Sequence, residues 1–206
     1  MNDKTKQKIE FDRQFLKVGE RYAVGVDEVG RGPLAGPVVC CAVIIDLFSE
    51  DFLDGVDDSK KVSEKKRELL FDQLRDSVVD YCICEISPEK IDEINILEAT
   101  KLCMKNCVEG LKKPFDVVLI DAMNIDIHTR KEIIVKGDAQ SYAIGSASII
   151  AKVYRDRLMV NHDKIYPEYS FAKNKGYGTK DHINAIKEIG SCPIHRKTFI
   201  KNFTAK

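Results

Sequence analysis

Residues 22–39 read YAVGVDEVGRGPLAGPVV, and this stretch decides how the rest of the chain is interpreted. It begins as an alternating apolar strand, meets the adjacent acids Asp27 and Glu28, and then passes through Gly30, Arg31 and Gly32. Adjacent residues on a regular strand point to opposite faces, so both acids can serve one site only if the strand ends or bends there. The glycines provide that freedom and let the backbone approach a ligand closely, although for the glycines alone a plain strand-to-turn junction is the favoured explanation.

The glycine spacing does not support the common nucleotide-binding loops. The run from Gly30 to Gly36 fits neither GxGxxG nor GxxxxGK[ST], and Pro33 removes one backbone donor.

The composition is that of an ordinary globular protein. The 206 residues are 44% hydrophobic and 32% charged, with six prolines, which predicts one core and a single domain over residues 1–206. The first residues are charged and no stretch approaches the ~20 apolar residues of a membrane span, so we expect a cytoplasmic protein that does not enter a membrane. The seven cysteines include no CxxC pair. We expect them, Cys103 and Cys107 included, to be small buried hydrophobes rather than zinc ligands.

Charge is distributed unevenly along the chain. The net charge is +0, yet residues 152–206 contain 12 Lys or Arg against 5 Asp or Glu, a surplus of seven positive charges. A basic C-terminal segment is typical of a polyanion-binding surface, and ordinary scatter of solvated charge explains it about as well.

Alternating or β-branched runs predict five strands, and longer periodic runs predict helices. The strands are expected at Tyr22–Val29, Pro37–Ile45, Val79–Ile86, Val117–Ile120 and Glu132–Val135. The helices are expected to begin after an N-cap at Ser63 and to span Asn95–Leu111 and Ser141–Val160. This order predicts an α/β fold with a mixed sheet, a helical C-terminal part over about 160–206, and an N-terminal arm over 1–20.

Two further acids follow predicted strands. Asp121 ends the apolar run that begins at Phe115, and Asp138 follows Val135-Lys-Gly just before a predicted helix. A turn-forming Asp or a helix cap explains either one alone. Three acidic clusters at three strand ends are harder to explain this way, because strand ends on one edge of a sheet converge.

Four carboxylates grouped at one sheet edge would raise one another's pKa unless a cation neutralised them. Ligation by oxygen alone selects a hard ion, Mg²⁺ or Mn²⁺, over zinc. Such ions typically serve phosphoryl chemistry.

Motifs run through the chain from Tyr22 to about Phe199. They are Asp27-Glu-Val-Gly-Arg-Gly-Pro-Leu-Ala-Gly-Pro-Val38, Asp58-Ser-Lys-Lys61, Asn95-Ile-Leu-Glu-Ala-Thr100, Ile120-Asp121, Lys136-Gly-Asp138, Ala147-Ser-Ile-Ile-Ala-Lys152 with Arg155-Asp156, Gly176-Tyr-Gly-Thr179 with His182, and His195-Arg-Lys-Thr-Phe199. In this combination the sequence resembles type 2 ribonuclease H, the ribonuclease HII family.

The resemblance implies the ribonuclease H-like fold, with a central mixed five-stranded sheet flanked by helices. It also implies an endonuclease that hydrolyses RNA in RNA–DNA hybrids and cuts 5′ of single ribonucleotides in duplex DNA, leaving a 3′-hydroxyl and a 5′-phosphate. Asp27, Glu28, Asp121 and Asp138 match the family's metal-binding acids.

Other positions match the family's substrate-binding motifs. Gly30, Arg31 and Gly32 match the motif whose backbone reads the ribose 2′-hydroxyl and whose arginine touches the junction backbone. Tyr177 matches the tyrosine that packs on the deoxyribose beyond the scissile bond. Further positions that contact phosphates or order the site are Lys60, Lys61, Ser148, Lys152 and Arg196, although a solvated surface charge is the ordinary interpretation of any one lysine.

Some features separate this chain from other members and relatives. Ala122 stands where many members have glycine, and the Gly-Arg-Gly motif and the roughly twenty residues before the first strand differ from ribonuclease HIII. The C-terminal residues from Phe199 lack a convincing sliding-clamp-binding peptide, and we expect a monomer. Alternative functions are a non-catalytic hybrid-binding protein and a general metal-dependent nuclease.

Overall fold

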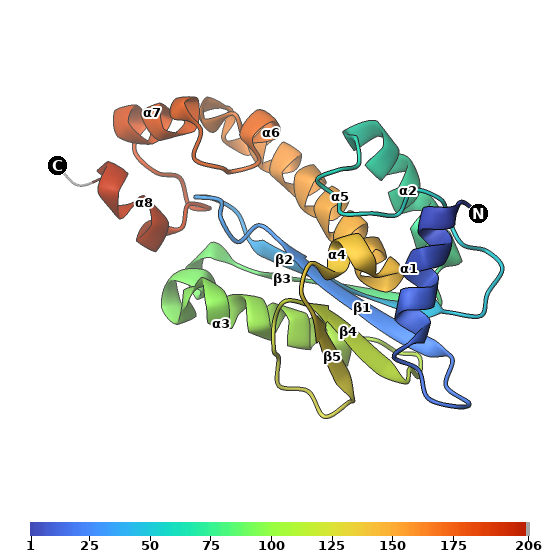
Figure 1. Ribbon diagram of the computed structural model, residues 1–206. Coiled ribbons are helices and arrows are strands. Elements are labelled where there is room, and N and C mark those ends of the chain that lie inside the picture. Colours follow the sequence, from blue (N-terminus) through green and yellow to red (C-terminus); the bar gives the residue numbers. More distant parts are fainter. Residues whose placement is uncertain (205–206) are drawn as a thin grey trace.

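Five strands form one mixed sheet in the computed structural model, which describes residues 1–204 (Figure 1). The strands are β1 (Tyr22–Val29), β2 (Val38–Asp46), β3 (Asp80–Ile86), β4 (Val117–Asp121) and β5 (Lys131–Ile134), in the order β3-β2-β1-β4-β5. The pairs β1–β2 and β2–β3 are antiparallel, whereas β1–β4 and β4–β5 are parallel. The five predicted strands are therefore confirmed, each to within one residue at either end.

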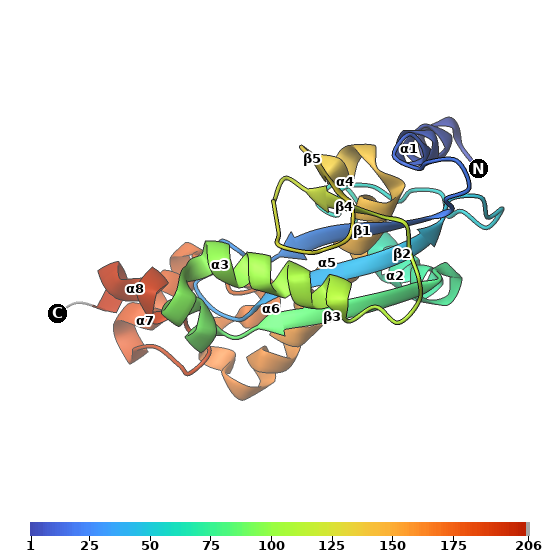
Figure 2. The ribbon, with the colours of Figure 1, turned by 90° about the horizontal axis from the view of Figure 1, so that it is seen from below.

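Helices cover both faces of this sheet (Figures 1 and 2). One face packs against α1 (Asp3–Arg13), α2 (Glu64–Ser77) and α5 (Tyr142–Ile165), and the other packs against α3 (Pro88–Glu109). The remaining helical segments are α4 (Gly137–Gln140), η1 (Pro167–Tyr169), α6 (Phe171–Asn174), α7 (Lys180–Ile189) and α8 (Lys197–Thr204). The alternating strand residues divide between the two faces, so each face has its own hydrophobic core.

Helix α5 approaches β1 very closely at Gly25. A Cβ atom at this position would lie 2.0 Å from the carbonyl carbon of Ala143, so only glycine permits the contact. This close packing places the first turn of α5 directly against the middle of β1.

Three helix boundaries differ from the sequence expectation. The helix expected from Asn95 begins at Pro88, but Asn95 has φ 66° and ψ 165°, and its side chain accepts hydrogen bonds from the amides of Leu97 and Glu98. Asn95 therefore caps the second half of a kinked helix. Helix α5 continues to Ile165, and residues 3–13, expected only as part of an arm, form α1, whose Ile9 joins the core of the sheet. Ser63 is the N-cap of α2, as expected, although its side chain makes no capping hydrogen bond.

The C-terminal helices enclose a third, smaller core. It consists of Ala35, Met159, Tyr169, Phe171, Ile186 and Ile200. Because Ala35 comes from the loop after β1, this core holds that loop against the C-terminal part. None of the helices among residues 1–204 is both long enough and apolar enough to span a membrane.

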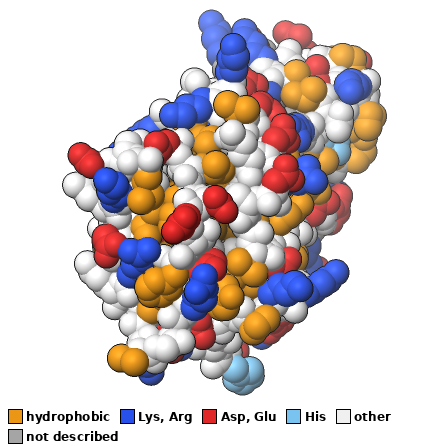
Figure 3. Space-filling view, turned by 90° about the vertical axis from the view of Figure 1, so that its right-hand side faces the viewer, with side chains coloured by type: hydrophobic (Ala, Val, Ile, Leu, Met, Phe, Trp, Pro, Cys, Tyr) orange, Lys and Arg blue, Asp and Glu red, His pale blue; other side chains and the backbone are white. Residues whose placement is uncertain are grey.

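Acidic and basic side chains are mixed on the face shown in Figure 3, which lies at the right of Figure 1. No broad area of a single sign covers this face, so it offers no continuous basic surface to a polyanion.

Candidate active site

One pocket of about 520 Å³ opens at the sheet edge where β1, β4 and β5 end. These strands are parallel, so the residues at or after their C-terminal ends meet there. The pocket contains every site residue predicted from the sequence except Lys61 and Arg196. It is lined by Asp27, Glu28, Val29, Gly30, Arg31, Gly32, Ser59, Lys60, Ile96, Asp121, Asp138, Ser148, Lys152, Tyr177 and Phe199.

Asp27 and Glu28 share the pocket because β1 ends one residue later. Their pairing with β2 is regular, opposite Cys41 and Cys40, so the strand does not bulge. Burial raises the pKa of Asp27 well above its ordinary value, and the nearby Glu28 carboxylate raises it further. Burial also raises the pKa of Glu28 to about 7, against the opposing effect of Arg31. Both acids are thus costly to ionise in this pocket.

Asp121 and Asp138 come from neighbouring segments that hold each other in place. The amide of Gly137 donates to Oδ1 of Asp121 over 2.7 Å. Burial raises the pKa of Asp121, and Asp138 raises it further. For Asp138 burial again acts first, and the second contribution comes from Asp58.

The four carboxylates lie in one pocket without surrounding a single point. Within residues 1–204 no three His, Cys, Asp or Glu side chains are arranged to hold a metal ion. The four carboxylates therefore line the pocket together without forming a ready-made cluster of three metal ligands. All four offer oxygen ligands, which suit a hard divalent cation.

The loop after β1 is shaped by two buried arginines. Arg155 donates to the carbonyls of Pro37, Lys175 and Ala35 over 2.9–3.1 Å. Arg196 donates in the same way to the carbonyls of Gly36, Arg31 and Gly30 over 2.6–2.9 Å. Both guanidinium groups are fully buried and occupied by backbone oxygens. The guanidinium group of Arg196 is therefore buried behind the loop after β1 and is held by carbonyls of that loop.

Gly30 and Gly32 meet different surroundings. Gly30 has φ +91°, and a Cβ atom there would lie 2.2 Å from Nε of Arg155. A Cβ atom at Gly32 would meet only the ring of Tyr177, at 3.8 Å. The Gly32 backbone thus faces open space inside the pocket.

A chain of hydrogen bonds fixes the backbone carbonyl of Tyr177. His182 Nδ1 lies 2.9 Å from that carbonyl, so it carries the proton and donates. His182 Nε2 must then accept from His195 Nε2, 2.9 Å away, and His195 Nδ1 accepts from the amide of Cys192. Burial, with a further contribution from His182, lowers the pKa of His195 to about 4, so both rings are neutral near pH 7.

The remaining predicted side chains divide between the pocket and its surroundings. The hydroxyl of Ser148 lies 3.0 Å from that of Ser59, and Lys152 pairs with Asp156 at 2.7 Å. Lys60 lines the pocket, whereas Lys61 is 61% exposed and lines a neighbouring cavity with Lys4.

Two positions near the site were not among the predicted site residues. Ser59 lines the pocket, and Asp58 raises the pKa of both Asp121 and Asp138. The motif Asp58-Ser-Lys-Lys61 contained both, but an acid in a predicted loop carried no signal beyond turn formation.

The family model described as ribonuclease HII matches residues 24–202, which include this whole pocket. The chain belongs to the ribonuclease HII family. The ribonuclease HII of Ruminiclostridium cellulolyticum is 48% identical over 202 residues, which cover 98% of this chain and 78% of that protein. As a member of the family the chain is a type 2 ribonuclease H, and the expected enzyme class is confirmed.

Solved ribonuclease HII structures confirm the fold. The ribonuclease H2 of Pyrococcus horikoshii superposes with a TM-score of 0.77 at 28% identity, covering 89% of this chain and 97% of that one. The ribonuclease HII of Archaeoglobus fulgidus, solved in complex with PCNA, gives a TM-score of 0.75 at 26% identity with the same coverage. The predicted ribonuclease H-like fold with its five-stranded mixed sheet is therefore correct.

Proposed function

We propose that this enzyme hydrolyses the RNA strand of RNA–DNA hybrids and cuts 5′ of single ribonucleotides embedded in duplex DNA, leaving a 3′-hydroxyl and a 5′-phosphate. The observation that carries the proposal is the shared pocket. It places four carboxylates beside a glycine backbone that faces open space and beside the half-exposed ring of Tyr177.

The carboxylates are the proposed metal ligands. Asp27, Glu28, Asp121 and Asp138 provide only oxygen donors, and burial together with repulsion from neighbouring carboxylates, Asp58 in the case of Asp138, raises the pKa of each. A cation would relieve that repulsion, so the residues fit Mg²⁺ or Mn²⁺. When bound, such an ion activates water and neutralises charge on the phosphate under attack.

The other pocket residues are proposed to bind and orient the substrate. The Gly32 backbone can approach a ribose 2′-hydroxyl because no Cβ atom intervenes. The side chain of Arg31 pairs with Glu28 at 3.4 Å but is 46% exposed, so it can also contact backbone phosphates. The ring of Tyr177, 42% exposed, offers a surface on which a sugar can pack. Lys60 and Lys152 add positive charge within the pocket.

Cleavage of matched duplexes tests the proposal. End-labelled DNA duplexes with one ribonucleotide, with four ribonucleotides and with none are incubated with Mg²⁺ or Mn²⁺, and the cuts are mapped to the nucleotide. We expect cleavage 5′ of the ribose with the all-DNA duplex intact. Cleavage of the all-DNA duplex would identify a general nuclease, and binding without cleavage would identify a hybrid-binding protein.

Asp121→Asn and Asp138→Asn test the assignment of the acids. Each variant removes one charge without changing the size of the side chain, so we expect at least a ~100-fold loss of cleavage, as for a lost group that stabilises charge in the transition state. Thermal unfolding should remain cooperative. Cleavage at the wild-type rate in either variant would remove that residue from the proposed site.

We further propose that residues 1–206 act as one monomeric catalytic domain, in which residues from about 160 onward help to bind substrate. The Archaeoglobus fulgidus relative was solved with PCNA. For this chain we propose no such clamp contact through residues 199–204. These residues lie in α8, where Ile200 is buried and Phe203 packs against the third core.

A further inference from the structure

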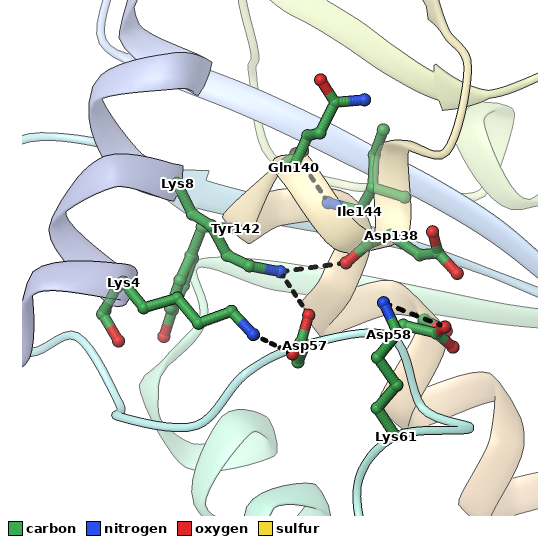
Figure 4. Close-up of polar contacts among 12 residues, drawn as sticks. Lys4, Lys8, Asp57, Asp58, Lys61, Asp138, Gln140, Tyr142 and Ile144 are labelled. Carbon is green, nitrogen blue, oxygen red and sulfur yellow. Dashed lines mark hydrogen bonds and ion pairs between the residues drawn. The ribbon is translucent and has the colours of Figure 1, made fainter.

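A buried lysine of α1 contacts the segment that carries Asp138 (Figure 4). Lys8 Nζ lies 3.0 Å from the carbonyl oxygen of Asp138 and 3.0 Å from Oδ1 of Asp57. The lysine side chain is only 3% exposed. An ammonium group this deeply buried is tolerated only when its partners compensate for the lost hydration, so these two contacts are the reason it can stay there.

The Asp138 carbonyl needs such a donor because the helix around it is interrupted. Helix α4 has only four residues, and Ser141 after it is extended, with φ −97° and ψ 137°. The amide of Tyr142, which would close a helical hydrogen bond to the Asp138 carbonyl, faces Asp12 of α1 instead, as does the amide of Ala143. Among residues 1–204 no backbone N–H outside the helices donates to the Asp138 carbonyl. Leaving a carbonyl unpaired away from water is unfavourable, and Lys8 supplies the donor.

Lys8 also joins this segment to a second one that faces the pocket. Its other partner, Asp57, directly precedes Asp58, whose charge acts on Asp121 and Asp138. At Gly145 helix α5 packs against both segments. A Cβ atom there would lie 3.3 Å from the Asp138 carbonyl oxygen and 3.7 Å from the Asp57 amide nitrogen. The ammonium group thus sits at a junction of three elements.

We propose that Lys8 is a positioning residue, which fixes the Asp138 segment relative to the rest of the acidic pocket. This inference rests on the proposed function, because that function assigns Asp138 to the site. Lys8 is not part of the pocket lining and acts through the backbone of α4. Helix α1 consequently supports the geometry of the site, although none of its side chains lines the pocket.

The test compares Lys8→Met with Lys4→Met. Lys4 also pairs with Asp57, but it is 64% exposed and its hydrogen bond goes to Asp57 rather than to Asp138. In Lys8→Met, Asp57 keeps its pairing with Lys4, so the specific defect is the unpaired Asp138 carbonyl. In Lys4→Met that carbonyl keeps its donor.

Steady-state cleavage of the single-ribonucleotide duplex should separate the two variants. We expect kcat of Lys8→Met to fall roughly 10- to 100-fold, in line with the effect of misplacing a site residue by about 1 Å, with KM little changed. Lys4→Met should retain the wild-type kcat and KM. Equal kcat values in the two variants would overturn the inference.

Two measurements that do not depend on activity complete the test. Hydrogen exchange followed by mass spectrometry should show faster exchange over residues 137–142 in Lys8→Met than in Lys4→Met. Titration with Mn²⁺, followed by electron paramagnetic resonance, should show weaker binding in Lys8→Met. Thermal unfolding must show that both variants are folded at the assay temperature. A loss of kcat that only follows the unfolded fraction would refute a positioning role.

These measurements also distinguish the two proposals. If the wild-type protein cleaves no ribonucleotide-containing duplex, the proposed function fails, and exchange and Mn²⁺ binding still decide whether Lys8 orders the Asp138 segment. If the wild-type protein cleaves as proposed and Lys8→Met matches Lys4→Met in every measurement, the positioning role alone fails.

Discussion

Replacing Gly32 by alanine should block cleavage and leave the fold intact, whereas the same change at Gly30 should disturb the fold itself. Gly30 has φ +91°, and a Cβ atom there would lie 2.2 Å from Nε of Arg155 and 2.9 Å from the carbonyl oxygen of Pro37. Arg155 cannot move away easily because three carbonyls hold its guanidinium group. At Gly32 the nearest atom to a new Cβ is 3.8 Å away, in Tyr177.

The expected change in the free energy of unfolding follows from these contacts. For Gly30→Ala, the left-handed backbone costs about 1–2 kcal/mol and the overpacking about 1–3 kcal/mol, so Tm should fall by roughly 4–20 °C. For Gly32→Ala, a substitution in open space changes stability by about 0.5 kcal/mol or less, so Tm should change by less than about 2 °C.

The cleavage rate per folded molecule should fall more in Gly32→Ala than in Gly30→Ala. In Gly32→Ala the methyl group occupies the space where the ribose would meet the backbone, and a displacement of about 1 Å costs about 100-fold in rate. The assay is single-turnover cleavage of the single-ribonucleotide duplex beside differential scanning calorimetry. Cleavage by Gly32→Ala within about threefold of wild type would refute the close approach of the ribose to Gly32. A wild-type Tm for Gly30→Ala would refute the steric argument.

Three further predictions concern acid titration, backbone strain and the position of Tyr177. Because burial raises the pKa of Glu28 from 4.5 to about 7, the stability linked to its protonation is present below pH about 4.5 and lost as the pH rises to about 7. With EDTA present, the Tm of Glu28→Gln should therefore rise relative to the Tm of wild type as the pH increases from 5 to 8. A difference in Tm between the two proteins that stays constant over this range would contradict the prediction. Ala122 is exposed and has φ 47°. Glycine would relieve the strain of this left-handed backbone but add conformational entropy to the unfolded chain, so Ala122→Gly should raise Tm by about 1–3 °C. A lower Tm would show that no strain is relieved. His195→Ala removes the hydrogen-bond donor to His182. It should raise KM roughly fivefold, the effect of one hydrogen bond of about 1 kcal/mol, and leave Mn²⁺ binding unchanged. An unchanged KM would show that the two histidines do not position Tyr177 for substrate binding.

Local pattern was sufficient for the sheet and for much of the pocket. Alternating apolar residues predicted all five strands, because one buried face and a period of two constrain a strand over a few residues. Acids that follow strands predicted the shared edge, since parallel strands bring their C-terminal ends together. The resemblance to a family added Tyr177, which pattern alone places only in a loop.

Long-range packing decided what the sequence left open. Helix α1 has a weak apolar face, and it is held by the buried contacts of Lys8 and Asp12 with segments about 130 residues away. The sequence also left open where the Arg196 side chain lies, and in the structure it is buried against the carbonyls of Gly30 and Arg31.

Sequence alone thus determined which residues could form strands, turns and an acidic site, since those properties depend on near neighbours. Only the tertiary structure decided which charged side chains are exposed in the pocket and which are buried and paired with other groups of the protein. The physical reason is that the free energy of a charged side chain depends on its burial and its partners, and for Lys8 and Arg196 those partners come from distant parts of the chain.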